Sequence, residues 1–316
     1  MPQATNLNTD PYYDDFDVDK KFHRILYRPG RAVQARELTQ QQSILQNQIE
    51  RFADHVFKDG SIVSGGNTTY NNNVGVIKLQ SNTILNSATS ADDSTTLKQK
   101  FNGRIIKLTN GDIRGRVILT LDSTTLDSET LLIEYINGNP TNGFLKDNTI
   151  ITITETGDTV NYKATIEDDG GKASVASIDD SIFYLSGHFV KIDRQSLSLH
   201  STDSDTNKRT FTGTPNKLVG LQKAEQLIDE NDDTSLNDPA QGSFNYAAPG
   251  ANRLKLQTSL IANDIDGSTS VSNRSDEDFI SLMLIVNGVI QEQIKYPILS
   301  DIEQRLAERT YAESGN

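Results

Sequence analysis

Acidic side chains at alternate positions are the first feature of this sequence that could do chemistry, because calcium loops use that spacing. The run at 229–233 fills the first three ligand positions, but Thr234 stands in place of the turn glycine and Ala240 in place of the bidentate glutamate. The run at 203–207 has Lys208 at the turn position. We interpret both runs as solvated loops and predict no metal site.

Residues for nucleophilic or cofactor chemistry are also missing from the sequence. There is no cysteine, no G-x-S-x-G elbow for a serine hydrolase and no G-x-x-x-x-G-K-[ST] loop for a nucleotide. The four histidines never occur in a ligand spacing such as His-x-x-x-His, so each is interpreted as a structural residue; they are His23, His55, His188 and His200. We predict no catalytic residue, no cofactor and no enzymatic activity.

Paired carboxylates suggest one competing enzymatic hypothesis. Glu155 and Glu167 fall on neighbouring predicted strands, and a glycosidase needs two acids across a sugar-binding cleft. Such pairs arise readily by chance among 43 acidic residues, and the chain has no tryptophan to form a sugar platform. A capsule depolymerase is therefore kept only as a third hypothesis.

The charge balance restricts the partners. Lys and Arg total 30 against 43 Asp and Glu, a net charge of −13, which on average repels nucleic-acid backbones and anionic lipid surfaces. No run reaches the roughly 18 consecutive apolar residues of a membrane-spanning helix. We therefore expect no nucleic-acid partner and no membrane insertion. Because the chain has no cysteine and only four histidines, its function must depend on oxygen-bearing side chains or on its surfaces.

One long helical pattern occupies residues 32–58. Apolar side chains recur with the alternating three- and four-residue spacing of a heptad seam, interrupted once by glutamine; the seam positions are Leu38, Gln42, Leu45, Ile49, Phe52 and Val56. The segment LTQQQSILQNQI at 38–49 carries no charge, although a solvated helix normally carries Glu and Lys pairs. The pattern favours a helix that packs against copies of itself or another subunit; the alternative is a helix covered by its own β domain.

The segment before this helix predicts an extended arm at residues 1–31. It carries more aromatic side chains than it can bury alone, so they should dock elsewhere on the protein or on a partner; they are Tyr12, Tyr13, Phe16, Phe22 and Tyr27. A Pro-Gly turn signal lies between Arg28 and Arg31. We assign these two arginines and the aromatics at 12, 13, 16 and 22 to the predicted assembly interface.

After the helix the hydrophobic period changes to two, which predicts β-strands. The expected strands are 74–80, 104–109, 113–121, 130–136, 149–156, 159–166, 182–185, 188–192, 196–200, 254–261, 279–286 and 289–294. Turn signals at 110–111, 157–158 and 287–288 suit hairpins. Residues 219–228 have apolar side chains at helical spacing and predict a short amphipathic helix, and Ser300 with Glu303 fits a capping box that opens a final helix.

These elements predict a mainly β, multi-domain protein with a long N-terminal α-helix and antiparallel β-sandwich or barrel-like subdomains. We divide it into the arm at 1–31, the assembly helix at 32–60, a linking strand region at 61–80, a β insertion at 81–170, a β-rich core at 171–300 and a helix start at 301–316.

Several segments resemble the N-terminal domain of a family of large virion structural proteins of tailed bacteriophages, notably T4-like phages and those of cyanobacteria. The matching segments are YYDDFDVDKKFHRILYRPGRAVQARELTQQ at 12–41, ILQNQIERF at 44–52, FKDG at 57–60, FYLSGHFV at 183–190 and DPAQGSFNYAAPGANRLK at 238–255. The resemblance covers nearly the whole chain and is loosest at 81–170.

What the resemblance implies is a baseplate or tail-fibre component that is made in the bacterial cytoplasm and resides in the virion. It implies a homo-oligomer, with a trimer favoured, and other tail or baseplate proteins as partners; it supplies no catalytic residue. It also leads us to expect that the chain continues beyond Asn316. The alternative hypothesis is a host-surface adhesin whose insertion at 81–170 binds saccharide.

Overall fold

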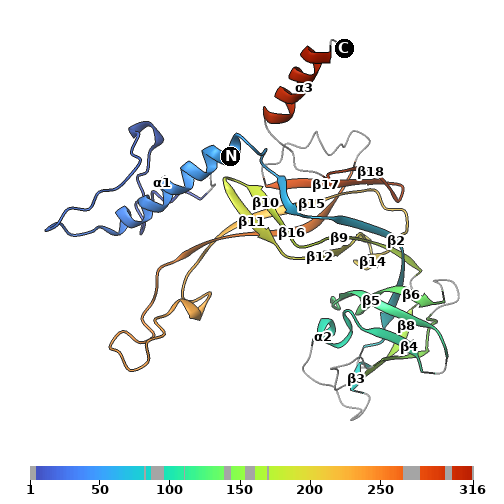
Figure 1. Ribbon diagram of the computed structural model, residues 1–316. Helices are drawn as coiled ribbons and strands as arrows, with labels where there is room; N and C mark the ends of the chain where they lie inside the picture. Colours follow the sequence, from blue (N-terminus) through green and yellow to red (C-terminus); the bar gives the residue numbers. More distant parts are fainter. Residues whose placement is uncertain are drawn as a thin grey trace.

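The computed structural model has the expected class: it is mainly β, with antiparallel sheets and one long N-terminal helix (Figure 1). It describes residues 5–81, 83–86, 96–109, 111–138, 144–153, 161–168, 171–265, 278–295 and 301–314. The helices are α1 (Ala35–Asp54), α2 (Leu97–Phe101) and α3 (Asp301–Ser314), with single 3-10 turns at Val18–Lys20 and Thr234–Leu236. No helix in these ranges has the length and apolar composition needed to cross a bilayer.

The strands fall into two groups along the chain. The first group is β1 (Ser61–Gly65), β2 (Thr68–Leu79), β3 (Leu85–Asn86), β4 (Ile105–Leu108), β5 (Arg114–Leu121), β6 (Thr130–Asn137), β7 (Thr149–Thr152) and β8 (Tyr162–Asp168). The second is β9 (Lys172–Ile178), β10 (Ser181–Leu185), β11 (His188–Ile192), β12 (Gln195–Ser198), β13 (Ser201–Thr202), β14 (Arg209–Thr210), β15 (Lys217–Ile228), β16 (Arg253–Asp264), β17 (Phe279–Val286) and β18 (Val289–Gln293).

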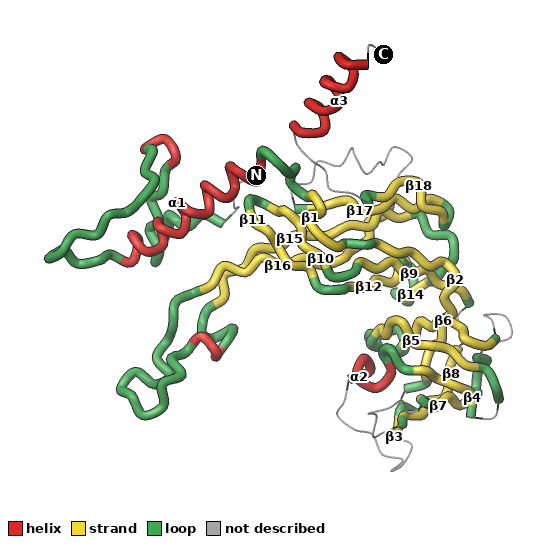
Figure 2. Tube along the Cα trace, in the orientation of Figure 1, coloured by secondary structure: helices red, strands yellow, loops and turns green. Residues whose placement is uncertain are grey.

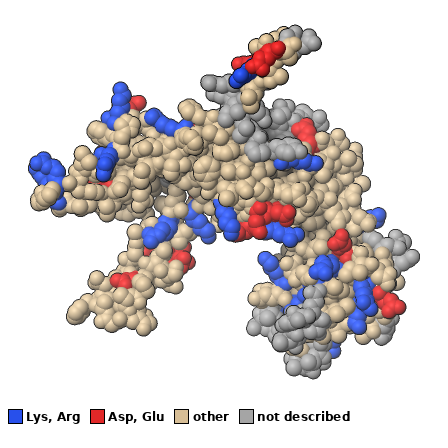
Figure 3. All heavy atoms as spheres, in the orientation of Figure 1, with Lys and Arg blue, Asp and Glu red and all other residues tan. Residues whose placement is uncertain are grey.

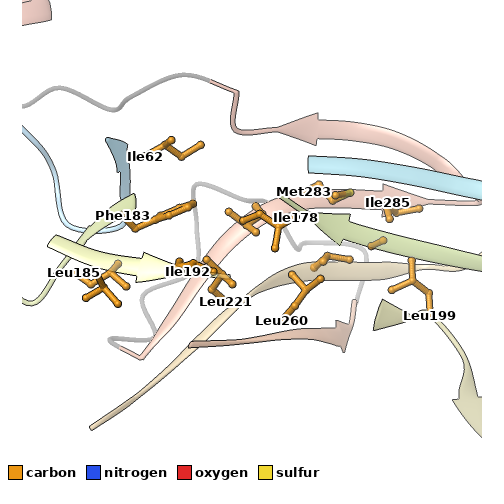
Figure 4. Packing of buried hydrophobic residues seen from close by; sticks show 14 residues of the cluster. Ile62, Ile178, Phe183, Leu185, Ile192, Leu199, Leu221, Leu260, Met283 and Ile285 are labelled. Atoms are coloured by element: carbon orange, nitrogen blue, oxygen red, sulfur yellow. The ribbon is translucent and has the colours of Figure 1, made fainter. Parts of the chain in front are cut away.

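The second group, with β1 and the start of β2, forms a layered body (Figure 2). A three-stranded sheet β1-β10-β11 and a four-stranded sheet β16-β15-β17-β18 lie beside the strands β12-β9-β2. Their inward side chains share one hydrophobic core, which includes Ile178, Phe183, Leu221 and Ile285 (Figure 4). None of the described residues of 81–170 belongs to this core.

A second compact part, which we call the barrel, is built by the ring β2-β6-β5-β4-β7-β8. The ring closes because the end of β2 pairs with β8 as well as with β6. Its interior is filled by large apolar side chains from the strands, from α2 and from the preceding and following loops, among them Phe101, Phe144 and Tyr162. Closure of a sheet on itself removes exposed strand edges.

Strand β2 belongs to both parts. Its first half pairs with β9 of the body, from Thr68 to Gly75, and its second half pairs with β6 and β8 of the barrel. A smaller apolar cluster lies at this crossing and includes Val74, Val76 and Leu132. The two parts are therefore joined by one continuous strand with packed side chains on it.

Most predicted strands are present, and the hairpin at 287–288 is confirmed: Asn287 and Gly288 both have positive φ, at 51° and 74°, as a primed turn requires. β4 pairs with β5 and β7 with β8, as the other two turn signals predicted. Residues 110 and 154–160, which include Gly157, Asp158 and Glu155, lie outside the described residues.

The helix predicted at 219–228 is wrong. These residues lie in β15, which pairs with β16 along its whole length and with β17 on its other side. Its first five residues are all buried, so a strand covered on both faces produced a nearly continuous apolar run with no clear period. The N-terminal helix is also shorter than predicted: it begins at Ala35 and ends at Asp54.

Candidate functional site

Local hydrogen bonds cap both ends of α1. The backbone N–H of Gln34 donates to the Glu37 carboxylate at 2.9 Å, which is half of a capping box. At the other end the backbone N–H of His55 turns back to the Phe52 carbonyl at 3.2 Å. Asp59 and Gly60 follow several residues beyond the end of the helix, and Gly60 has a positive φ of 82°.

One face of α1 packs on the chain's own body. Gln46 Nε2 donates to the Gly187 carbonyl at 2.5 Å, and Ile44, which lies near Phe16 and Phe22 of the arm, and Ala53 are buried. The hydroxyl of Tyr184, which is fully buried, donates to Asp54 at 2.6 Å. Burial, together with this hydrogen bond and the charge of Asp54, raises the pKa of the Tyr184 hydroxyl, which keeps it a neutral donor. The inner face is fixed by polar bonds at least as much as by apolar contact.

The opposite face of α1 carries the predicted seam, and in the single chain it is exposed. The exposed fractions are 52% for Leu38, 54% for Leu45, 47% for Ile49 and 72% for Phe52. Gln42 is exposed between them, and Val56, which follows the helix, is half-buried. We call these six residues the α1 stripe. An isolated exposed apolar residue is ordinary, but a continuous row of large ones is typical of an interaction surface.

The arm lies beside α1 and is held there by polar contacts (Figure 1). Asp14 accepts a hydrogen bond from the Ser43 hydroxyl, Gln40 donates to Asp15 at 3.2 Å, and Tyr12 accepts from Asn252 at 2.6 Å. Between the arm, α1 and the β10–β11 turn lies a cavity of about 560 Å³. No apolar residue of the arm is buried within residues 5–31, so the arm contributes no core of its own.

The predicted arm residues divide into two groups. Tyr12 and Phe16 are half-buried against their own chain, whereas Tyr13 and Phe22 are exposed. Arg28 and Arg31 are exposed on the two sides of the Pro-Gly turn, where the backbone N–H of Arg31 donates to the Arg28 carbonyl at 3.3 Å. The structure thus brings the arm and the α1 stripe into one region, although not into a single buried cluster.

The acidic runs considered as calcium loops act as local caps. Asp229 accepts backbone N–H bonds from Asn231 and Asp232, which hold the pKa of its carboxyl below the usual range. Asp203 does the same for its own loop, through the backbone N–H groups of residues 205 and 206. In the described ranges no three His, Asp or Glu side chains gather as metal ligands would. Of the two acids considered for a glycosidase, Glu167 accepts a hydrogen bond from Ser128, and Glu155 lies outside the described residues.

Sequence reasoning missed a second projection, the long β15–β16 hairpin with its connection at 229–252. The connection extends away from the body and is fixed internally, with Asp238 and Ala247 bonded through the backbone at 2.9 Å (Figure 1). Phe244 is fully exposed at its end and Tyr246 is half-exposed. The sequence did carry a sign that this connection is unusual: residues 239–252 have no charged side chain.

Comparison with known proteins gives a family but no function. The family model described as a domain of unknown function, DUF4815, matches residues 10–105 and 146–316. The chain belongs to the DUF4815 family. No curated protein and no solved structure matches it. The part that the DUF4815 model leaves unmatched, 106–145, contains β5 and β6 of the barrel and lies inside the predicted insertion.

Proposed function

We propose that the chain is a structural subunit of a tailed-phage virion, at the baseplate or a tail fibre, and that it acts by assembly with other subunits and has no catalytic role. The observation that carries this proposal is the exposed α1 stripe. The sequence resemblance to phage virion proteins supports the same assignment and supplies the location, in the tail or baseplate of a particle made in the bacterial cytoplasm.

The geometry of α1 supports a second helix as the partner of the stripe. The inner face of α1 is already occupied by its own body and arm, so the stripe is free to meet another copy of the chain. Each large apolar side chain that becomes fully buried contributes about 1.5–3 kcal/mol. The four large residues of the stripe are 47–72% exposed in the single chain, so each would contribute roughly half of that amount toward the cost of association.

Gln42 has a defined role in this proposal. A polar residue inside an apolar seam destabilises most alternative registers, because its amide must find a partner in the bundle. Gln42 is exposed and lies in the middle of the stripe, so it would set register and copy number, with three copies favoured. The exposed Tyr13, Phe22, Arg28 and Arg31 of the arm would contact an adjacent subunit or another tail protein.

The test is the mass of the chain in solution, measured by light scattering. We expect the unaltered protein to give a multiple of its 34.9 kDa chain mass. Leu45→Asp with Phe52→Asp should reduce it to a monomer without loss of secondary structure, because both side chains are exposed in the single chain.

A matched control is offered by Leu126→Asp with Ile136→Asp. These two apolar residues of the barrel are 53% and 55% exposed and lie far from α1 in the sequence, so the same change of charge should leave the oligomer intact. An unchanged mass in the Leu45 and Phe52 variant would refute the assembly role of the stripe.

A further inference from the structure

A groove of about 840 Å³ lies between the body and the barrel. One wall comes from the barrel, through α2, the residues that follow it and β5; the other comes from β2, β9 and β12 of the body. Figure 3 shows the indentation between the two parts, with Lys and Arg side chains along its edges and an acidic patch on the body edge. The assembly proposal makes no use of this groove.

The charge of the groove is opposite to that of the whole chain. Among the residues that the structure describes, Lys98, Arg116 and Arg194 line it and no acidic residue does, although the protein has a net charge of −13. Arg194 is partly neutralised by Asp179, at 3.7 Å. Within the described residues, Arg116 donates only to the Gly103 carbonyl, at 3.4 Å, and Lys98 makes no side-chain bond. Two cations therefore remain available for a ligand.

The body wall of the groove is rich in groups that both donate and accept hydrogen bonds. The hydroxyls of Thr69 and Ser177 are 2.6 Å apart and exposed, and either one can donate to the other. Asn71 and Asn102 add amides from the two walls. Hydroxyl and amide groups of this kind suit a ligand whose own surface is covered with hydroxyls.

We propose that this groove binds a linear acidic saccharide. Its carboxylates would pair with Lys98 and Arg116, and its hydroxyls would bond to the side chains of Thr69, Ser177 and the two asparagines. Single-stranded nucleic acid is disfavoured because Tyr70 is the one aromatic residue in the described part of the lining, so a row of bases has no row of rings to stack on.

The test is equilibrium binding of the full chain to a panel of acidic polysaccharides: polygalacturonate, alginate and hyaluronan. We expect at least one to bind, and binding to weaken in 0.5 M salt, since screening acts on exposed charge pairs. Methyl-esterified polygalacturonate has the same backbone without the charge, and it should not bind. Lys98→Gln with Arg116→Gln should weaken binding about tenfold, the loss expected when about 1.4 kcal/mol of ion pairing is removed.

The control variant removes the same charge from the same part of the chain. Lys107 and Arg114 are cross-strand partners in β4 and β5 and do not line the groove, so Lys107→Gln with Arg114→Gln should bind as the unaltered chain does. Absence of binding to the whole panel, or equal binding of the esterified polymer, would overturn the proposal. If polyglutamate bound more tightly than every polysaccharide of the panel, the ligand of the groove would be an acidic peptide and the saccharide proposal would be wrong. The Leu45 and Phe52 variant should keep its saccharide binding, which separates this inference from the assembly role.

Discussion

Asp127 shows how a single residue fixes the barrel against the body. It lies in the β5–β6 loop, its side chain is 2% exposed, and it accepts hydrogen bonds from Lys78 Nζ at 2.7 Å and from the backbone N–H of Arg209 at 3.2 Å. Burial alone would raise the pKa of this carboxyl, but these bonds and the two positive charges outweigh burial and hold the pKa below its usual range. The ionised form is therefore the stable one in the folded protein.

We predict that Asp127→Asn destabilises the protein by about 3–5 kcal/mol at pH 7, because it leaves two buried cations without their anion. A folded pKa below the unfolded one stabilises the protein above the unfolded pKa and ceases to do so as the pH falls through the folded pKa. The difference from the unaltered chain should thus be largest near neutrality and shrink below about pH 4. Urea unfolding at several pH values measures it.

Asp193→Asn is the control for this experiment. Asp193 also pairs with a lysine, Lys191, at 2.8 Å, but the two side chains are 80% and 74% exposed. An exposed pair contributes little, so its loss should change the free energy of unfolding by less than about 1 kcal/mol at any pH. Equal effects of the two substitutions would mean that burial of Asp127 has no energetic consequence.

Strand β15 shows why some strands of this protein are predictable from sequence and others are not. The alternating strands of the barrel were predictable because one face of each is covered and the other is not. β15 is covered on both sides at its start, so its apolar residues follow no period, and the spacing of Leu221, Ala224 and Leu227 imitated a helix. Gly220, within that run, was the available sign against a helix.

Gly220 also provides a prediction about this element. A Cβ at this position would lie 2.3 Å from the Ile280 carbonyl oxygen and 2.5 Å from the Phe279 ring, beside an irregularity in the β15–β17 pairing. Gly220→Ala should therefore destabilise the body by about 1–3 kcal/mol, measured as a lower melting temperature. Gly111→Ala meets only ordinary contacts at 3.5 Å and should change stability little. Similar melting temperatures for both variants would contradict the close packing of β15 on β17.

The candidate surfaces were predictable to different degrees. The α1 stripe was visible in the sequence because a heptad seam needs only local spacing, and the structure leaves it exposed. The groove could not be read from the sequence: Lys98 and Arg116 meet Thr69 and Ser177 only because β2 carries the chain from one part to the other. Likewise, closure of the barrel depends on the pairing of β2 with β8, which is long-range and has no local signal.

For the whole molecule, the body core predicts that the barrel is dispensable for folding. None of its residues lies between 81 and 170, and Lys78 and Asp168 are paired where the chain enters and leaves the barrel. Replacing residues 81–169 by a short Gly-Ser linker should leave a folded body that unfolds cooperatively. Its stability should be lower, because Val74 and Val76 become uncovered and Lys78 loses Asp127.

The measurement for this deletion is thermal unfolding followed by circular dichroism, with the mass from light scattering. Deletion of only 106–145 is the matched comparison, since it removes β5 and β6 and opens the ring. That shorter deletion should expose most of the barrel core and bind a hydrophobic dye strongly, whereas the full replacement should bind much less dye, since only the β2 side chains are uncovered. A non-cooperative transition after full replacement would contradict an independent body.

The passage of β2 from body to barrel has a mechanical consequence. Twelve residues of one strand span the crossing, a length of about 40 Å at roughly 3.3 Å per residue. A load applied to the barrel along this direction acts in shear on many backbone hydrogen bonds at once, since both halves of β2 are laddered to neighbours. The barrel is therefore a rigid extension of the body. A force applied to the barrel is transmitted directly to the body through β2, which a flexible linker would not do.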